Sequence, residues 1–144
     1  MRVVVVGAGS GGAAAVAELG AAGHSVVLWA RSEATLAPFV AAGGVRYAGV
    51  LGEGLAEPAL ITSDIRAAIA GADAAVVALP TFAHASVATA LAEAGWKADR
   101  PVILNPGHTG GALEFAEAPR QAGAALPPLA EFSTLSYVAR QYAP

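Results

Sequence analysis

The sequence predicts a doubly wound α/β domain, with a mostly parallel β-sheet and helices on both of its faces. Two observations carry this prediction. Apolar segments of strand length alternate with helix-length segments along the 144 residues, an order typical of parallel sheets with right-handed crossovers. The first expected strand, residues 2–6, carries a continuous rather than alternating apolar run at 3–6, as in a strand that is buried on both faces.

A glycine-rich motif directly follows this first strand. Residues 7–12 read Gly-Ala-Gly-Ser-Gly-Gly, and an alanine-rich helix is expected over 10–22. A strand, a turn with the spacing Gly-x-Gly-x-x-Gly and a helix form the phosphate-binding corner of a Rossmann-like, dinucleotide-binding domain. We therefore expect the coenzyme to contact Gly7, Ala8, Gly9, Ser10, Gly11 and Gly12. The alternative is a plain strand–turn–helix unit without a ligand.

Each glycine of the motif has its own expected role. Gly7 allows the tight turn, Gly9 lets a pyrophosphate approach the main chain, and Gly12 lets the helix lie close to the strand. The N-terminus of the helix then offers free N–H groups and a positive dipole end to the phosphates.

The remaining elements follow in regular order over one domain, residues 1–144. Ser63 is expected to cap a short helix, and the apolar tail 133–140 is a candidate last strand. The glycine-rich stretch 43–62 is less regular, with short strands expected near 45–50 and 58–62. The other expected strands are 25–30, 74–79, 101–105 and 128–132, and the other expected helices are 33–42, 64–70, 83–95 and 110–122.

Composition restricts the partners and the location of the protein. The chain has a net charge of −3 and a single lysine, which argues against a nucleic-acid partner. No apolar run is long enough to span a bilayer, and glycines interrupt residues 1–20 where an export signal would be apolar. The chain has no cysteine, and its three histidines lack metal-ligand spacing. We expect a cytoplasmic protein without a metal, nucleic-acid or membrane partner.

Four segments are expected to meet at the carboxyl edge of the sheet, where ligands bind in folds of this class. They are residues 7–12, 30–32, 79–82 and 105–111. Beyond the glycine motif, the expected coenzyme contacts are Ala30, Arg31, Ser32, Leu79, Pro80, Thr81, Asn105, Pro106 and Gly107.

The end of the second strand favours NADP over NAD. NAD-binding domains usually place an acidic residue there, which accepts hydrogen bonds from the ribose 2′-hydroxyl. Here the place is taken by Arg31 and Ser32, which can hold a 2′-phosphate by charge-assisted hydrogen bonds. Glu33 comes one or two residues too late and is expected to complement the helix dipole. The alternatives are that Arg31 is a solvated surface residue, or stacks on adenine in either coenzyme, which leaves NAD open.

Several motifs resemble those of the opine dehydrogenase family, which includes octopine and nopaline dehydrogenases. The longest is Asn-Pro-Gly-His-Thr-Gly-Gly-Ala-Leu-Glu-Phe at 105–115, and the others are residues 7–12, 62–64, 79–80, 84–86 and 131–140. The resemblance covers essentially the whole chain. It implies an oxidoreductase that joins an amino acid to a 2-oxo acid such as pyruvate and reduces the resulting imine with a nicotinamide coenzyme. Glycerol-3-phosphate dehydrogenases and ketopantoate reductases are more distant relatives with a similar N-terminal domain.

The resemblance also implies a second, helical domain that carries the family's catalytic histidine and aspartate. The sequence ends at Pro144, where that domain would begin, and His24, His84 and His108 do not match the catalytic position. We therefore name no catalytic residue and expect the chain to bind coenzyme but to turn over poorly alone. Apolar surface over 133–143 is expected to lead to a homodimer or to an aggregation-prone chain. Two alternatives remain: a stand-alone dinucleotide-binding sensor or interaction module, and a reductase domain of the ketopantoate or glycerol-3-phosphate type.

Four residues are candidates for the substrate or nicotinamide side of the site. His84 could contact the coenzyme, or it could be an ordinary surface histidine of a helix. Thr109 and the helix start after it could offer N–H groups to a ribose or a carboxylate, or simply cap the helix, and His108 lies in the same loop. Glu131 either faces the nicotinamide or, if buried, pairs with Arg140.

Overall fold

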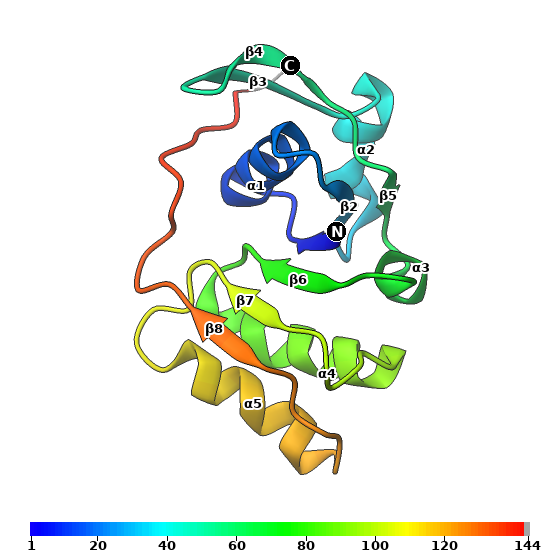
Figure 1. The fold of residues 1–144 in the computed structure, drawn as a ribbon, viewed down its shortest axis with the longest axis vertical. Helices are drawn as coiled ribbons and strands as arrows, with labels where there is room; N and C mark the ends of the chain where they lie inside the picture. Colours follow the sequence, from blue (N-terminus) through cyan, green and yellow to red (C-terminus); the bar gives the residue numbers. More distant parts are fainter. Residues whose placement is uncertain (143–144) are drawn as a thin grey trace.

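The computed structural model describes residues 1–142 and contains one six-stranded sheet in which all neighbouring strands are parallel (Figure 1). The predicted doubly wound α/β fold is confirmed. The order reverses between β1 and β6, so this is the point at which ligands bind in such sheets. Across the sheet the strands are β5 (Leu60–Thr62), β2 (Ser25–Trp29), β1 (Arg2–Val6), β6 (Ala74–Val77), β7 (Val102–Leu104) and β8 (Leu129–Glu131).

Helices cover both faces of the sheet and enclose two apolar cores. In β1, Val4 and Val6 pack in one core with residues of α4 and α5, while Val5 packs in the other with residues of α1 and α2. This explains why β1 is a continuous run of valines: each face needs its own apolar side chains. The helices are α1 (Ser10–Ala21), α2 (Glu33–Ala42), α3 (Ile65–Ile69), the 3-10 helix η1 (Thr81–Ala83), α4 (His84–Ala94) and α5 (Gly111–Gln121).

The glycine-rich stretch 43–62 contains a hairpin that differs from the prediction. Strand β3 (Val45–Gly49) pairs antiparallel with β4 (Gly52–Ala56), ahead of β5. Sequence reasoning missed β4 because Gly-Glu-Gly-Leu-Ala has none of the β-branched and aromatic residues that are typical of strands. Buried Val45 and Ala56 join the core around α1, and this tertiary packing holds the hairpin.

Helix α3 begins at a different cap from the one predicted. The carboxylate of Asp64, not the hydroxyl of Ser63, accepts the N–H groups of Arg66 and Ala67 at 2.9 and 3.3 Å. Aspartate competes well for this position because its charge also complements the helix dipole. The hydroxyl of Ser63 is therefore left for another partner.

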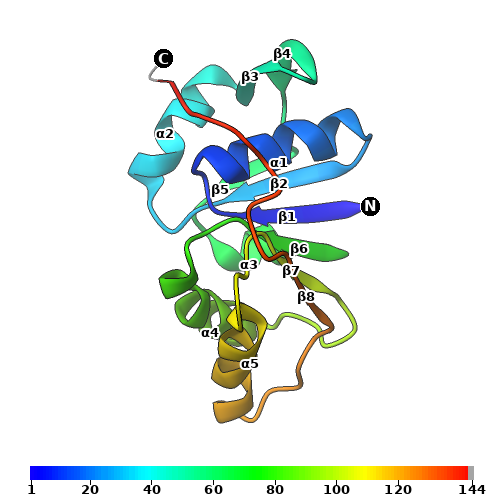
Figure 2. The same cartoon turned by 90° about the vertical axis from the view of Figure 1, so that its left-hand side faces the viewer.

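The chain after β8 does not form a further strand. Residues 133–142 run as an extended segment from β8 past the sheet and α1 toward the hairpin, drawn in red in Figure 2, and we call this segment the strap. Contacts that involve side chains, rather than a β-ladder, hold the strap in place. The prediction of a last strand over 133–140 is therefore wrong. Among residues 1–142, no helix has the length and apolar character to cross a membrane.

Candidate coenzyme site

The glycine loop after β1 is shaped by close contacts at two of its glycines. Gly7 has a φ of 115°, and a Cβ there would lie 2.6 Å from the carbonyl oxygen of Ala78. A Cβ at Gly12 would overlap the carbonyl oxygen of Gly7. At Gly9, in contrast, a Cβ would meet no atom within 4 Å. The loop is therefore packed tightly against the sheet and open at Gly9, the geometry that a pyrophosphate requires.

The N-terminus of α1 presents main-chain donors at this opening. The first backbone hydrogen bond of the helix runs from Ala13 N to Gly9 O at 2.9 Å, and Gly9 supplies no side-chain cap. Within residues 1–142, the N–H groups of Ser10, Gly11 and Gly12 have no backbone acceptor. Free donors at the positive end of a twelve-residue helix fit an anionic group such as a diphosphate.

At the end of β2, the chain passes from buried to exposed residues. Trp29 and Ala30 are buried, and the indole N–H of Trp29 donates to Ser63 O at 3.0 Å. Arg31 and Ser32 are exposed, and Ser32 precedes α2 without a side-chain capping bond. The structure thus leaves a guanidinium and a hydroxyl free beside the end of this strand.

The ends of β6 and β7 contribute in different ways. The side chain of Leu79 lies against Gly7, while Pro80 is exposed and Thr81 begins η1. Asn105 is buried, and both polar groups of its side chain bind Ser136 of the strap, at 2.7 and 2.9 Å. Pro106 and Gly107 continue this turn, in which Gly107 N donates to Phe132 O at 2.9 Å.

The strap lies against the glycine loop, a feature that sequence reasoning missed. Leu135 packs on Gly11, where a Cβ would lie 2.9 Å from its side chain. Gln141 donates from its main chain to the hydroxyl of Ser10 at 3.1 Å and from its side chain to Ala8 O at 3.2 Å. The strap touches the loop on both sides of Gly9 and leaves the space over Gly9 open, so the contacts are compatible with a bound diphosphate.

His84 is buried, so it is not the surface histidine of the alternative prediction. Its Nε2 lies 3.3 Å from Leu79 O, and its Nδ1 has no hydrogen-bond partner. Burial lowers the pKa of His84 below its usual value, although the Leu79 carbonyl and the carboxylates of Glu114 and Glu131 oppose this shift. Burial therefore favours the neutral form of the ring.

Glu131 is exposed and does not pair with Arg140. Its Oε2 accepts the N–H of Ala112 at 2.6 Å and so caps the first turn of α5. A Cβ at Gly111 would lie 3.3 Å from His84 Nδ1 and 3.4 Å from Glu131 Oε2, which places these two side chains around Gly111. His108, with a φ of 54°, and Thr109 are exposed in the adjoining loop. Of the N–H groups at the start of α5, that of Ala112 is therefore taken by Glu131 and not free for a ligand.

The described residues include no group of three or more histidine or acidic side chains that could hold a metal ion. The main-chain donors at the start of α1, with Arg31 at one end of this edge and the loop 105–111 at the other, can bind a phosphate-rich nucleotide.

Known proteins with a similar sequence are dehydrogenases. The chain is 36% identical over 140 residues to an opine dehydrogenase of Arthrobacter sp. (strain 1C), an alignment that covers 97% of this chain and 39% of that protein. The chain thus spans about two fifths of the length of this relative. The resemblance to opine dehydrogenases predicted from residues 105–115 is confirmed by this match.

Solved structures of dehydrogenases share the fold. A yersinopine dehydrogenase aligns with a TM-score of 0.70 at 18% identity, over 85% of this chain and 32% of that one. A glycerol-3-phosphate dehydrogenase from Coxiella burnetii aligns with a TM-score of 0.65 at 23% identity, over 86% of this chain and 38% of that one.

The family of the N-terminal domain of NAD-dependent glycerol-3-phosphate dehydrogenase matches residues 2–115, from β1 into α5. This range includes the glycine loop and the ends of β2, β6 and β7. The chain belongs to this family of dinucleotide-binding dehydrogenase domains.

Proposed function

We propose that this chain is the NADP-binding domain of an opine-dehydrogenase-like oxidoreductase, which reduces an imine formed from an amino acid and a 2-oxo acid. The observation that carries the coenzyme part of the proposal is the glycine loop, open at Gly9 and followed by the free N–H groups of α1. The imine part is supported by the opine dehydrogenase of Arthrobacter, the relative that matches 97% of the chain.

The preference for NADP over NAD rests on the end of β2. Arg31 and Ser32 are exposed there and are free of capping bonds, so both can bind a 2′-phosphate. In this proposal the main chain at 7–12 holds the diphosphate, the residues 79–81 and 105–107 lie along the nicotinamide half, and the nicotinamide supplies the hydride. His84, His108, Thr109 and Glu131 stand on the side from which a substrate would approach.

A second, helical domain supplies the catalytic histidine and aspartate in this proposal, on the same polypeptide or on another chain. This chain alone then binds the coenzyme and turns over poorly or not at all. We further propose a cytoplasmic location, because the composition has no feature of export, and self-association through apolar residues of the strap. Val138 and Tyr142 are 108% and 87% exposed.

A second candidate function is a reductase of the glycerol-3-phosphate type. The match of residues 2–115 to the glycerol-3-phosphate dehydrogenase family favours it. The two candidates share the coenzyme site and differ in the substrate, which the second domain would select.

The experiment that tests the proposal is a titration of the chain with NADPH and NADH, followed by the fluorescence of Trp29 and Trp96. Saturable binding of one coenzyme per chain, tighter for NADPH, is expected. Pyruvate and a set of amino acids are then added with NADPH to the chain together with its helical domain, and loss of absorbance at 340 nm is expected. Oxidation of NADPH by dihydroxyacetone phosphate, and not by pyruvate with an amino acid, would favour the second candidate.

A further inference from the structure

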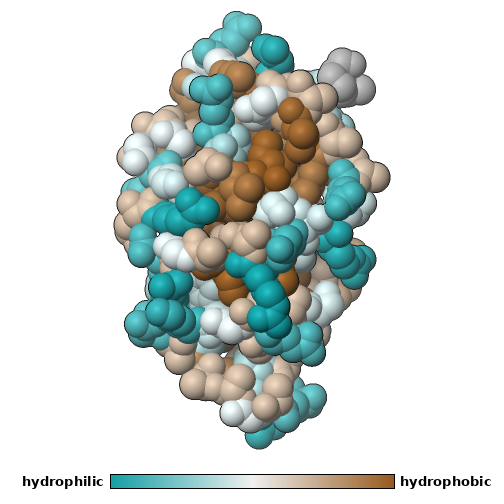
Figure 3. Space-filling model, turned by 90° about the vertical axis from the view of Figure 1, so that its right-hand side faces the viewer, coloured by the Kyte–Doolittle hydropathy of each residue, from teal (hydrophilic) through white to brown (hydrophobic). Residues whose placement is uncertain are grey.

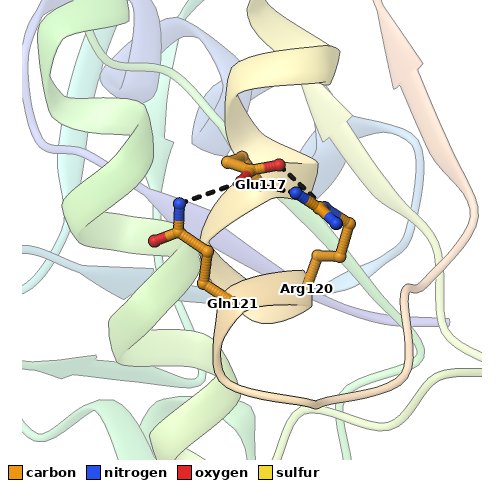
Figure 4. A network of polar contacts seen from close by, with 3 residues as sticks. All are labelled: Glu117, Arg120 and Gln121. Atoms are coloured by element: carbon orange, nitrogen blue, oxygen red, sulfur yellow. Dashed lines mark hydrogen bonds and ion pairs between the residues drawn. The ribbon is translucent and has the colours of Figure 1, made fainter.

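The turn between β2 and α2 holds two opposite charges that do not pair with each other. Arg31 follows β2, Glu33 begins α2, and both side chains are exposed. Among residues 1–142, the ion pair within 4 Å is that of Glu117 and Arg120 in α5, which Gln121 also joins (Figure 4). Glu33 therefore leaves the charge of Arg31 uncompensated, although the two residues are two positions apart.

Glu33 has another partner. Its Oε1 accepts a hydrogen bond from the hydroxyl of Ser63 at 3.3 Å. Ser63 follows β5, which is the edge strand beside β2, whereas β1 and the glycine loop lie on the opposite side of β2. The hydrogen bond thus draws the carboxylate of Glu33 toward the edge of the sheet and away from the loop.

Ser63 is well placed to act as this partner. On one side, the indole N–H of the buried Trp29 holds its carbonyl at 3.0 Å. On the other side, Asp64 N donates to the hydroxyl of Thr62 at 3.0 Å and Asp64 caps α3. Because Asp64 performs the capping, the hydroxyl of Ser63 is not used by α3 and stays with Glu33.

We propose that Ser63 is a specificity-determining residue, which holds Glu33 away from Arg31 and so keeps the guanidinium available to a 2′-phosphate. The inference rests on the proposed binding of NADP. An arginine near the end of the second strand accommodates the 2′-phosphate of NADP, and a carboxylate paired with that arginine would neutralise the charge that holds the phosphate. The direction in which Glu33 points therefore sets the balance between the two coenzymes. Ser63 acts through Glu33 and does not itself touch the coenzyme.

The test is calorimetric measurement of the dissociation constants for NADPH and NADH in the intact chain and in Ser63→Ala. Loss of the hydroxyl frees Glu33 to pair with Arg31. NADPH binding is expected to weaken about two- to fivefold, the range that corresponds to an exposed ion pair, while NADH binding stays unchanged. Ser63→Thr keeps a hydroxyl and should retain the NADPH affinity of the original chain.

The Glu33→Gln background separates this role from a merely structural one. A neutral amide cannot neutralise Arg31, so Ser63→Ala should have no effect on NADPH binding in that background. Three results would overturn the inference: unchanged NADPH affinity in Ser63→Ala, equal weakening of NADPH and NADH, or an effect that persists with Gln at position 33. A chain that binds neither coenzyme, or prefers NADH, contradicts the proposed function itself and removes the basis of the inference.

Discussion

Asn105 and Ser136 exchange two hydrogen bonds across 31 positions of sequence. The Asn105 amide donates to the Ser136 hydroxyl at 2.7 Å, and the Ser136 N–H donates to the Asn105 carbonyl oxygen at 2.9 Å. The buried amide at the end of β7 thereby fixes the strap, and Leu135 and Gln141 of the strap contact the glycine loop. Through the strap, this pair links the end of β7 to the glycine loop after β1.

Ser136→Ala should lower the free energy of unfolding by about 1–3 kcal/mol, because it leaves the buried amide of Asn105 without an acceptor. Urea unfolding measures the change. Ser133→Ala is the matched control: its side chain is exposed on the same strap and should cost less than about 0.5 kcal/mol. Equal effects of the two substitutions would show that the pair does not fix the strap.

Gly9→Val should abolish coenzyme binding while the chain stays folded. A side chain at Gly9 enters open space in the protein, but it fills the volume that a diphosphate needs. Gly12→Ala should instead destabilise the fold, since its Cβ would overlap the Gly7 carbonyl. Thermal unfolding and coenzyme titration of both variants distinguish the two roles. Retained affinity in Gly9→Val would place the coenzyme elsewhere.

Arg31→Asp should change the coenzyme preference from NADP to NAD. The substitution removes the cation expected to bind the 2′-phosphate and introduces the acid that is typical of NAD-binding domains. NADPH affinity is expected to fall by about tenfold or more, as for the loss of a charge-assisted hydrogen bond, and NADH affinity should hold or rise. An unaltered ratio of the two dissociation constants would refute the assignment of Arg31.

His84 should make the fold less stable as the pH falls. Its folded pKa lies below its unfolded value of about 6.5, so the unfolded chain binds more protons and stability is lost below that pH. Glu114 of α5 and Glu131 of β8 oppose the shift, and His108 of the neighbouring loop adds to it. Unfolding free energies at pH 7.5 and 5.5 should differ more in the original chain than in His84→Leu.

A direct measurement on the imidazole keeps this prediction testable if His84→Leu does not fold. In an NMR titration, the His84 ring should remain neutral down to a pH below about 6.5. Protonation at or above that pH would contradict the burial that the structure shows for this side chain.

Self-association through the strap should depend on its exposed apolar side chains. Sedimentation of the chain at rising concentration should show a dimer, and Val138→Asp should shift the profile toward the monomer. Figure 3 shows a second gathering of apolar atoms, on the opposite side from the strap and in the upper half where α2 and β5 lie in Figure 1. A dimer that persists in Val138→Asp would point to that surface, and a monomer at all concentrations would exclude the proposed association.

The features that local sequence determines could be predicted, and those that depend on distant contacts could not. The glycine loop and the strands expected at 2–6, 25–30, 58–62, 74–79, 101–105 and 128–132 follow from valine runs, glycine spacing and helix length, and the structure has a parallel strand within each of these ranges. Strand β4 was missed because its glycines carry no strand signal, and only packing of Val45 and Ala56 against α1 reveals it. The strap has the residue types of a strand, but it donates hydrogen bonds to the side chains of Asn105, Ser10 and Glu18 rather than to the main chain of a neighbouring strand.

The candidate site shows the same division. Arg31 and Ser32 are exposed after the end of β2, which is compatible both with a 2′-phosphate site and with a solvated Arg31, so their role stays a prediction. Burial of His84 and the capping of α5 by Glu131 arise where α4, α5 and β8 meet, which no local pattern indicates. The bond between Ser63 and Glu33 likewise joins the turn after β5 to the start of α2, 30 positions apart.

The central claim, that the glycine loop binds a nicotinamide dinucleotide, is tested most directly by two-dimensional amide NMR of the chain during addition of NADPH. Saturable shifts at the N–H groups of Ser10, Gly11 and Gly12, with further shifts at Arg31 and Ser32, are the expected result. Absence of saturable shifts, or shifts confined to residues away from the carboxyl edge of the sheet, would contradict the account.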